Sequence, residues 1–313
     1  MKYFVTGGAG FIGSNIVDYL ISKGNKVIVY DNLSTGRREF IAHHLKNPDF
    51  KFVQGDLNNT TLLANSLKNC DFVFHLAAHA DVRSGVTDHF IDHNQNLEMT
   101  HNVLEAVSTT GIKKLAFIST SSVYGDAKIH PTPEDYPFQP TSLYGATKAA
   151  CESYIQAYSS YFGFQSYIFR LVSFTGERYT HGIAVDILKK LKDSPKLLTL
   201  LSDGTPKKSS LYVGDGIEAF FTVIKKANEK VNIYNIGHDQ VLSVKQIAQT
   251  VLQASSNSGV KIKWLGKQSN WKGDNTFVLL DNSKLKRLGW EPKHSVKDGI
   301  TKTVQYLLKS NLI

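Results

Sequence analysis

Short hydrophobic runs alternate with amphipathic segments through the first half of the chain. Runs rich in Val, Phe and Ile, typical of buried strands, occupy residues 2–6, 26–31, 50–56, 71–78 and 113–120. Between the first two runs, Ile12, Ile16 and Leu20 follow one face of a helix from Phe11 to Lys23, which ends at Gly24. Strands alternating with helices predict a doubly wound α/β fold, a parallel sheet covered by helices on both faces.

The pattern changes in the second half of the chain. Residues 126–141 show no periodicity and contain half of the prolines, and a patternless loop of that length is more often functional than not. Helical patterns then recur less regularly, near residues 182–193, 214–228, 243–255 and 295–308. We therefore expect two domains. Residues 1–172 form the first, with 210–240 (including "SSLYVGD" and "NIYNIG") returning to its sheet, and residues 173–209 and 241–313 form a smaller α/β lobe.

A glycine-rich turn, "TGGAGFIGS" at residues 6–14, joins the first strand to the first helix. Gly7 permits the tight turn, Gly10 lets a diphosphate approach the backbone, and Gly13 lets helix and strand pack closely. The helix N-terminus supplies N–H donors and positive potential to the anion. Asp31, at the end of the second strand, is at the expected distance along the chain to bind an adenosine ribose. These features together predict a dinucleotide site.

The residues near Asp31 bear on which dinucleotide is bound. A carboxylate at this position favours NAD, because it would repel the additional phosphate of NADP. Arg37 and Arg38 follow a few residues later, and their positive charges are the feature that would reverse this preference in favour of NADP. Asp56 and Leu57, after the third strand, are expected to frame the adenine, although an acid there is equally typical of a helix cap.

"SLYGATK", residues 142–148, places Tyr144 and Lys148 four positions apart, on one face of a helix. A tyrosine that acts as a base near neutral pH needs nearby positive charge, because lowering its pKa by about three units takes roughly 4 kcal/mol. The same spacing also fits an amphipathic helix with a core tyrosine and a solvated lysine, so the rest of the chain must decide.

The composition excludes several classes of protein. The net charge is +9, but the lysines are spread along the chain and form no basic tract, so we expect no nucleic-acid binding. No apolar run approaches the roughly 20 residues of a membrane span. The N-terminus reads as strand, turn and helix rather than a signal peptide, so we expect a cytoplasmic protein.

Cysteine and histidine give no indication of a metal site. Cys70 and Cys151 are too few for a disulfide framework or a thiolate zinc site. Four histidines stand out as possible acids or ligands: His43, His44, His79 and His181. None of them is paired at metal-ligand spacing with a supporting acid or thiol, so we expect no metal.

With these pieces together, the chain resembles the extended short-chain dehydrogenase/reductase family, and most closely its UDP-galactose (UDP-glucose) 4-epimerases and their nucleotide-sugar relatives. Along the chain the matching motifs are "TGGAGFIGS", "DNLSTG", "GDL", "HLAA", Asn96 with "HNVLEA", "STSSVYG", "YGATK", "FRLVSFTGERYTHG", "LYVGD", "YNIG" and "LKRLGW". The resemblance implies a Rossmann-type sheet, a bound NAD, a UDP-hexose substrate and a homodimer formed through two helices, near residues 91–107 and 144–162.

The resemblance also implies roles for individual residues. Tyr144 would be the catalytic base, Lys148 would bind the nicotinamide ribose and help lower the pKa of the tyrosine, and Thr120 would bind the reacting sugar hydroxyl. The implied cofactor-binding residues are Gly7, Gly10, Phe11, Ile12, Gly13, Asp31, Asn32, Asp56, Leu57, Ala77, Ala78, Asn96, Tyr144 and Lys148. The implied substrate-binding residues are Thr120, Ser121, Ser173, Lys208 and Trp271.

Two features of the chain bear on the reaction. Related 4,6-dehydratases carry an Asp-Glu pair after the threonine, whereas Ser121 and Ser122 stand here, and neutral hydroxyls are poor acids and bases for eliminating water. Ser173, Lys208 and Trp271 replace an asparagine and two arginines that are common in the epimerases. The alternatives therefore stay open: epimerases of N-acetyl or uronic forms, a UDP-glucuronate decarboxylase, a nucleotide-sugar reductase, or a non-catalytic NAD-sensing protein.

Overall fold

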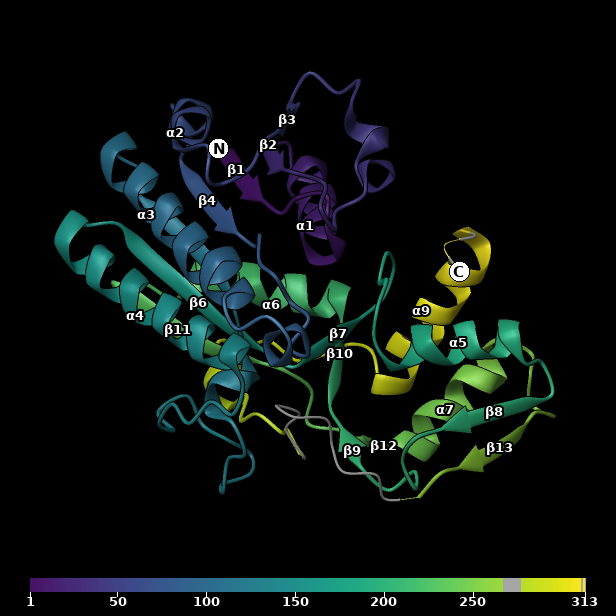
Figure 1. The fold of residues 1–313 in the computed structure, drawn as a ribbon. Coiled ribbons are helices and arrows are strands. Elements are labelled where there is room, and N and C mark those ends of the chain that lie inside the picture. The colour runs from purple at the N-terminus through teal and green to yellow at the C-terminus, as the bar shows by residue number, and fades with distance from the viewer. Residues whose placement is uncertain (267–276, 311, 313) are drawn as a thin grey trace.

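The computed structural model describes residues 1–266, 277–310 and 312, and its largest element is a seven-stranded sheet (Figure 1). All strands are parallel, in the order β11-β6-β5-β4-β1-β2-β3. The strands are β1 (Lys2–Thr6), β2 (Lys26–Asp31), β3 (Phe50–Gln54), β4 (Phe72–His75), β5 (Lys114–Thr120), β6 (Gln165–Leu171) and β11 (Val231–Ile236). The predicted doubly wound parallel sheet is confirmed. Its strand order reverses between β1 and β4, where ligands of such sheets bind.

Helices cover both faces of this sheet. On one face lie α1 (Phe11–Ser22) and α6 (Val213–Lys226), whose Val17 and Phe220 share a buried cluster with Val5 of β1. On the other face lie α2 (Thr60–Leu67), α3 (Met99–Thr110) and α4 (Leu143–Phe162), which pack on a second cluster. Two buried faces explain why the strands are hydrophobic runs without alternation.

A third hydrophobic cluster lies apart from the sheet and supports the proposed smaller lobe. Figure 1 shows α5 (Ile183–Asp193), α7 (Val244–Ala254) and α9 (Val296–Ser310) grouped beside the strand pair β8 (Leu197–Leu200) and β13 (Lys261–Trp264). Smaller elements include β9 (Lys207–Lys208), which pairs with β12 (Leu242–Ser243), and the short helix α8 (Ser283–Lys286). The exact boundaries of the two domains stay a prediction.

Two predictions about elements differ from the structure. "NIYNIG" joins the large sheet as β11, but "SSLYVGD" does not: β10 (Ser210–Tyr212) pairs with β7 (Ser173–Thr175) in a separate two-stranded sheet. The reason is that β7 follows β6 after a single residue, so its partner lies beyond the end of the large sheet. The helix expected over 91–107 begins with a π-helical segment, His93–Glu98, before α3.

The proline-rich segment 126–141 lies against the carboxyl ends of β6 and β11. Arg170 of β6 donates a hydrogen bond from Nη1 to the Glu134 carbonyl oxygen at 2.7 Å. The backbone N–H of Asn235 in β11 donates to Glu134 Oε1 at 3.0 Å. This loop is therefore fixed over the edge of the sheet at which the other candidate site residues lie.

Candidate active site

The turn between β1 and α1 has no room for side chains at two of its glycines. Gly7 has φ +67°, which favours glycine, and a Cβ atom there would lie 2.7 Å from the backbone nitrogen of Ala77. A Cβ atom at Gly13 would lie 2.2 Å from the carbonyl oxygen of Gly7. The start of α1 therefore packs closely against the turn at Gly13, as the sequence predicts.

We expect Gly13→Ala to damage both the fold and nucleotide binding, because its methyl group must push the Gly7 carbonyl out of the turn. Overpacking of this kind costs about 1–3 kcal/mol of unfolding free energy. We expect NAD affinity to fall at least about tenfold, which corresponds to roughly 1.4 kcal/mol. Urea denaturation and NAD titration measure the two effects. Gly259→Ala is the control, since a Cβ atom there meets nothing within 4 Å. Equal behaviour of the two variants would contradict this account of the turn.

The outer side of the same turn is open and suited to an anion. A Cβ atom at Gly10, the N-cap of α1, would contact only the Gly7 carbonyl oxygen, at 3.2 Å. The first turn of α1 begins at Phe11. The backbone N–H groups of Phe11, Ile12 and Gly13 have no hydrogen-bond acceptor within the helix, as is general for a helix N-terminus. The cradle therefore fits the diphosphate of a dinucleotide.

Asp31 is held rigidly at the end of β2. Its Oδ2 accepts from the Ala9 N–H at 2.9 Å, and its Oδ1 accepts from the Leu33 N–H at 2.8 Å. Burial raises the pKa of the Asp31 carboxyl, and these two backbone donors oppose that rise. A Cβ atom at Gly36 would lie 2.8 Å from Asp31 Oδ1, so the chain passes close to the carboxylate. The guanidinium of Arg37 lies 3.5 Å from Glu39 at the surface.

The residues predicted around the adenine divide into surface and core positions. Asn32 Nδ2 donates to Asp56 Oδ2 at 2.8 Å, and Asp56 Oδ1 accepts from the Asn58 N–H at 2.9 Å. This second bond closes a local turn, whereas α2 is capped by Asn59, whose Oδ1 accepts from the Leu62 N–H at 3.0 Å, so the capping alternative for Asp56 is wrong. Leu57 is buried in the hydrophobic cluster on the side of α2 and α3. An adenine contact for Asp56 and Leu57 stays a prediction.

The segment after β4 is held by Asn96 of the π-helical segment. Asn96 Oδ1 accepts from the His79 N–H at 2.8 Å, and Asn96 Nδ2 donates to the His79 carbonyl oxygen at 3.1 Å. Asp92, fully buried, has one oxygen 3.2 Å from His79 Nδ1. These bonds fix Ala77 and Ala78, just before His79, beside the glycine turn.

A buried chain of polar side chains, which the sequence analysis did not identify, links the glycine turn to α3. Thr6 Oγ1 accepts from the Leu76 and Ala77 N–H groups and lies 2.8 Å from His75 Nδ1. His75 Nε2 lies 3.0 Å from Thr100 Oγ1. The sequence offered little signal, since Thr6 ends one hydrophobic run but His75 lies inside another, and only the register of β1 and β4 pairs the two residues.

The burial of His75 predicts a dependence of stability on pH. Burial and, to a lesser degree, the charge of Lys148 lower the pKa of His75 from 6.5 to about 3. Between these values the unfolded chain binds a proton that the native protein does not, so stability falls as pH decreases below 6.5. The slope that His75 contributes is up to about 1.4 kcal/mol per pH unit. Urea unfolding from pH 7.5 to 5 should show this slope reduced in His75→Gln but kept in a variant of the exposed His93. An unreduced slope in His75→Gln would contradict the prediction.

Tyr144, Lys148 and Thr120 converge where β5 ends and α4 begins. The Ser142 hydroxyl caps α4 by accepting from the Gly145 N–H at 3.1 Å, so Tyr144 and Lys148 stand on one face of its first turns. Burial raises the pKa of Tyr144 to about 12, and the neighbouring hydroxyl of Thr120 lowers it only in part.

The charge of Lys148 is set by its burial. Lys148 is almost fully buried, and its Nζ lies 3.9 Å from the centre of the Phe117 ring. Burial lowers the pKa of Lys148 to about 8, while Cys151 and Glu152 raise it. A role of Lys148 in lowering the pKa of Tyr144 stays a prediction.

The predicted substrate residues are only partly gathered near Tyr144. Ser121 follows Thr120 directly, and the hydroxyl of Ser122 accepts from Thr120 Oγ1 at 3.2 Å. Ser173 is exposed at the start of β7, and Lys208 lies in β9. Trp271 lies outside the described residues. Substrate contacts for these residues stay predictions.

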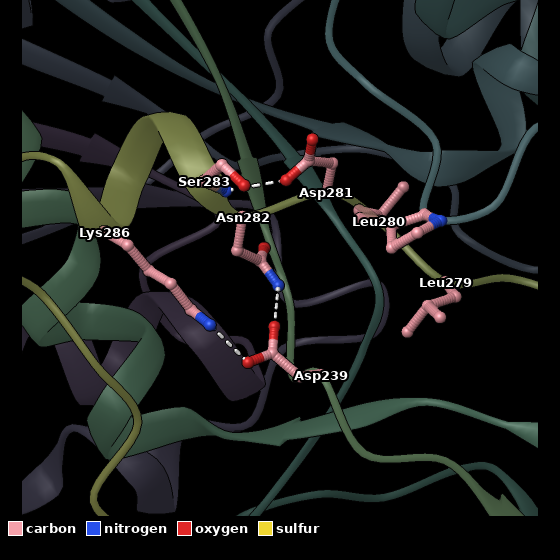
Figure 2. A pocket seen from close by; sticks show the side chains of 8 residues that line it. Asp239, Leu279, Leu280, Asp281, Asn282, Ser283 and Lys286 are labelled. Carbon is pink, nitrogen blue, oxygen red and sulfur yellow. Dashed lines mark hydrogen bonds and ion pairs between the residues drawn. The ribbon is translucent and has the colours of Figure 1, made fainter.

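A separate cavity of about 230 Å³ lies between the proline-rich loop and α8. Figure 2 shows Asp239 in this cavity, accepting from Asn282 Nδ2 at 3.3 Å and paired with Lys286. None of the predicted site residues in the described part of the chain lines it. We therefore place the chemistry at Tyr144 and the glycine turn.

Known proteins resemble this chain over nearly its whole length. Residues 3–237 match the model of the NAD dependent epimerase/dehydratase family. A putative UDP-glucose 4-epimerase from Methanocaldococcus jannaschii is 33% identical, covering 98% of both chains. A crystal structure of a UDP-galactose 4-epimerase is 36% identical with a TM-score of 0.88, covering 99% of both chains. The UDP-glucuronic acid 4-epimerase from Bacillus cereus, in complex with UDP-glucuronic acid and NAD, is 29% identical with a TM-score of 0.90, covering 99% of this chain and all of the other.

Proposed function

Because the chain belongs to the NAD dependent epimerase/dehydratase family, we propose that it is a UDP-hexose 4-epimerase that interconverts UDP-glucose and UDP-galactose. The observation that carries this proposal is Thr120 beside Tyr144, followed in the chain by the neutral Ser121 and Ser122. A redox step at one hydroxyl needs a single acid–base group, which Tyr144 supplies. Elimination of water needs an additional acid and base, which hydroxyl groups do not supply at neutral pH.

In the proposed mechanism Tyr144 takes the proton from the 4-hydroxyl of the sugar and later returns it. A bound NAD, held by the glycine turn and Asp31, would supply the acceptor and donor for the hydride of carbon 4, and its positive ring would add to the charge of Lys148 in favouring the phenolate. Thr120 orients the reacting hydroxyl beside Tyr144, and the 4-keto sugar turns over in the pocket between the two transfers. Burial of Tyr144 opposes the phenolate, because it raises the pKa of this tyrosine.

The cofactor of this NAD-dependent family is NAD, and we propose that Asp31 is the residue that excludes NADP. Asp31 carries a fixed, buried carboxylate at the position expected for the adenosine ribose, and a further phosphate there would be repelled. The nearby Arg37 is already paired with Glu39. Titration of NAD and NADP followed by fluorescence tests this preference.

The decisive experiment is to incubate the purified protein with UDP-galactose and no added cofactor, following UDP-glucose by NMR. We expect conversion, because redox-neutral epimerisation regenerates a cofactor that stays bound. Parallel tubes contain UDP-N-acetylgalactosamine and UDP-glucuronate. Conversion in only one of those tubes, also after addition of NAD, would replace the proposed substrate. Release of carbon dioxide would reveal a decarboxylase, consumption of added NADH or NADPH a reductase, and no reaction in any tube an NAD-sensing protein.

We also propose a homodimer formed through α3 and α4. Large aromatic side chains at the end of α4 support it, since Tyr161 is 81% exposed and Phe162 is 52% exposed. Exposed apolar groups gathered on one surface are typical of protein interfaces. Light scattering after size exclusion should give the mass of two chains, and a monomer at micromolar concentrations would refute the dimer.

No helix within the described part of the chain is long and apolar enough to cross a membrane. We propose a cytoplasmic location, as the sequence predicts, and partners limited to the nucleotide sugar and a second copy of the chain. Fractionation of cells that express the protein would test this location.

A further inference from the structure

Three side chains suited to a divalent cation meet on the outside of the nucleotide domain. They are Asp18 of α1 and His43 and His44 of the 3₁₀ turn Ala42–His44. The Nε2 atoms of His43 and His44 lie 2.9 Å and 2.6 Å from the same oxygen of Asp18, Oδ1. All three atoms lie within 4.8 Å of one another. We propose that Asp18, His43 and His44 form a binding site for one zinc ion.

The three groups have the chemistry that zinc prefers. Two imidazole nitrogens and one carboxylate oxygen are a common ligand set for Zn²⁺, which leaves a fourth position to water. With metal–ligand bonds of about 2.0–2.2 Å in a tetrahedral arrangement, ligand atoms lie about 3.3–3.6 Å apart. The two imidazoles therefore need to move outward by about 0.4–1.0 Å. His43 has an exposed side chain at the surface, where such an adjustment meets little resistance.

The carboxylate is already oriented by a neighbouring residue, as metal-binding carboxylates usually are. The second oxygen of Asp18, Oδ2, accepts a hydrogen bond from Arg178 Nη2 at 2.6 Å. This contact leaves Oδ1 directed at the two histidines. Because the charge of Arg178 also opposes a cation, we expect weaker binding than at a thiolate zinc site.

The position of the site gives it a structural consequence. Asp18 belongs to the helix whose N-terminus forms the anion cradle, and His43 and His44 belong to the segment that follows Asp31. Arg178 belongs to the segment that leads into α5. A bound zinc ion would hold the segment after Asp31 against α1, and Arg178 would extend that connection toward the smaller lobe.

From the sequence we expect no metal, because none of the histidines is paired at metal-ligand spacing with a supporting acid or thiol. The acid is Asp18, which lies 25 residues before His43 in the chain. The fold brings it to the histidines by placing α1 beside the turn Ala42–His44. The same distances also arise without a metal if both imidazoles are neutral and donate from Nε2 to Asp18. A zinc site and a hydrogen-bonded cluster without metal differ in their affinity for zinc, which a titration measures directly.

Untagged protein is treated with a chelator, dialysed and titrated with zinc chloride against a chromophoric chelator. We expect one zinc ion per chain with a Kd below about 100 µM, equivalent to roughly −5.5 kcal/mol. His43→Gln should weaken binding at least about tenfold, a loss of roughly 1.4 kcal/mol. His89→Gln, which removes an exposed histidine outside the site, should leave binding unchanged. The midpoint of thermal unfolding should rise with zinc in the wild type and far less in His43→Gln.

Two further measurements keep the proposal falsifiable if one variant misfolds. X-ray absorption at the zinc edge should show nitrogen and oxygen neighbours, including two imidazoles. His44→Gln should also lose zinc while its circular dichroism spectrum stays native. The absence of saturable binding at one ion per chain, or binding unchanged in both histidine variants, would overturn the proposal. Both results are independent of epimerase activity.

Discussion

Tyr144→Phe is expected to keep the fold and NAD binding but to lose turnover by about 100-fold to 10,000-fold, the usual contribution of a general acid–base group. The ring still packs at the start of α4, while the hydroxyl beside Thr120 is removed. Initial rates with UDP-galactose, together with NAD titration and circular dichroism, separate the loss of chemistry from a loss of structure.

The matched control is Tyr161→Phe, the same chemical change on the same helix at an exposed position. It should keep turnover near that of the wild type. Near-normal turnover of Tyr144→Phe would refute the proposed base. An inactive Tyr144→Phe variant that also fails to bind NAD would instead place the tyrosine in cofactor binding.

Glu152→Leu is expected to lower the unfolding free energy by about 3–5 kcal/mol, because it leaves a buried guanidinium without its counter-charge. Glu152 of α4 is fully buried and accepts two hydrogen bonds from Arg170 Nε at 3.1 Å and one from Nη2 at 2.8 Å. It also accepts from Ser119 of β5. Arg170 in turn donates to Tyr124 and to the Glu134 carbonyl oxygen of the proline-rich loop. Urea denaturation measures the loss.

Two comparisons isolate the buried charge as the cause. Glu218→Gln breaks the exposed pair with Lys293 and should cost only about 0–1 kcal/mol. Glu152→Leu combined with Arg170→Met should recover much of the stability, since removing both charges avoids an unpaired one. A double variant no more stable than Glu152→Leu would show that packing, rather than charge, explains the loss.

Local patterns were sufficient for the sheet and for the cofactor cradle. A strand buried on both faces must be hydrophobic along its length, so the runs ending at Thr6, Asp31 and Thr120 identified their own strands. The glycine spacing of the first turn is also local, because its contacts lie within residues 7–13 and against the adjacent strand end. These features gave the fold class and the dinucleotide site, whereas the family came from the resemblance of the motifs along the whole chain.

Local patterns could not predict which strand "SSLYVGD" pairs with. Its three paired residues fit either sheet equally well, and the choice depended on where β7 leaves the end of β6. Short strands carry too little periodicity to decide their partner.

The protonation state of the site and its long-range contacts were decided by tertiary structure alone. The sequence placed Tyr144 and Lys148 on one helix face but could not show that burial raises the pKa of the phenol to about 12. It likewise could not join Thr6 to His75 or Asp18 to His43, which are far apart in the chain. Periodicity reports which face of an element is buried, whereas desolvation and side-chain contacts depend on which elements the folded chain brings together.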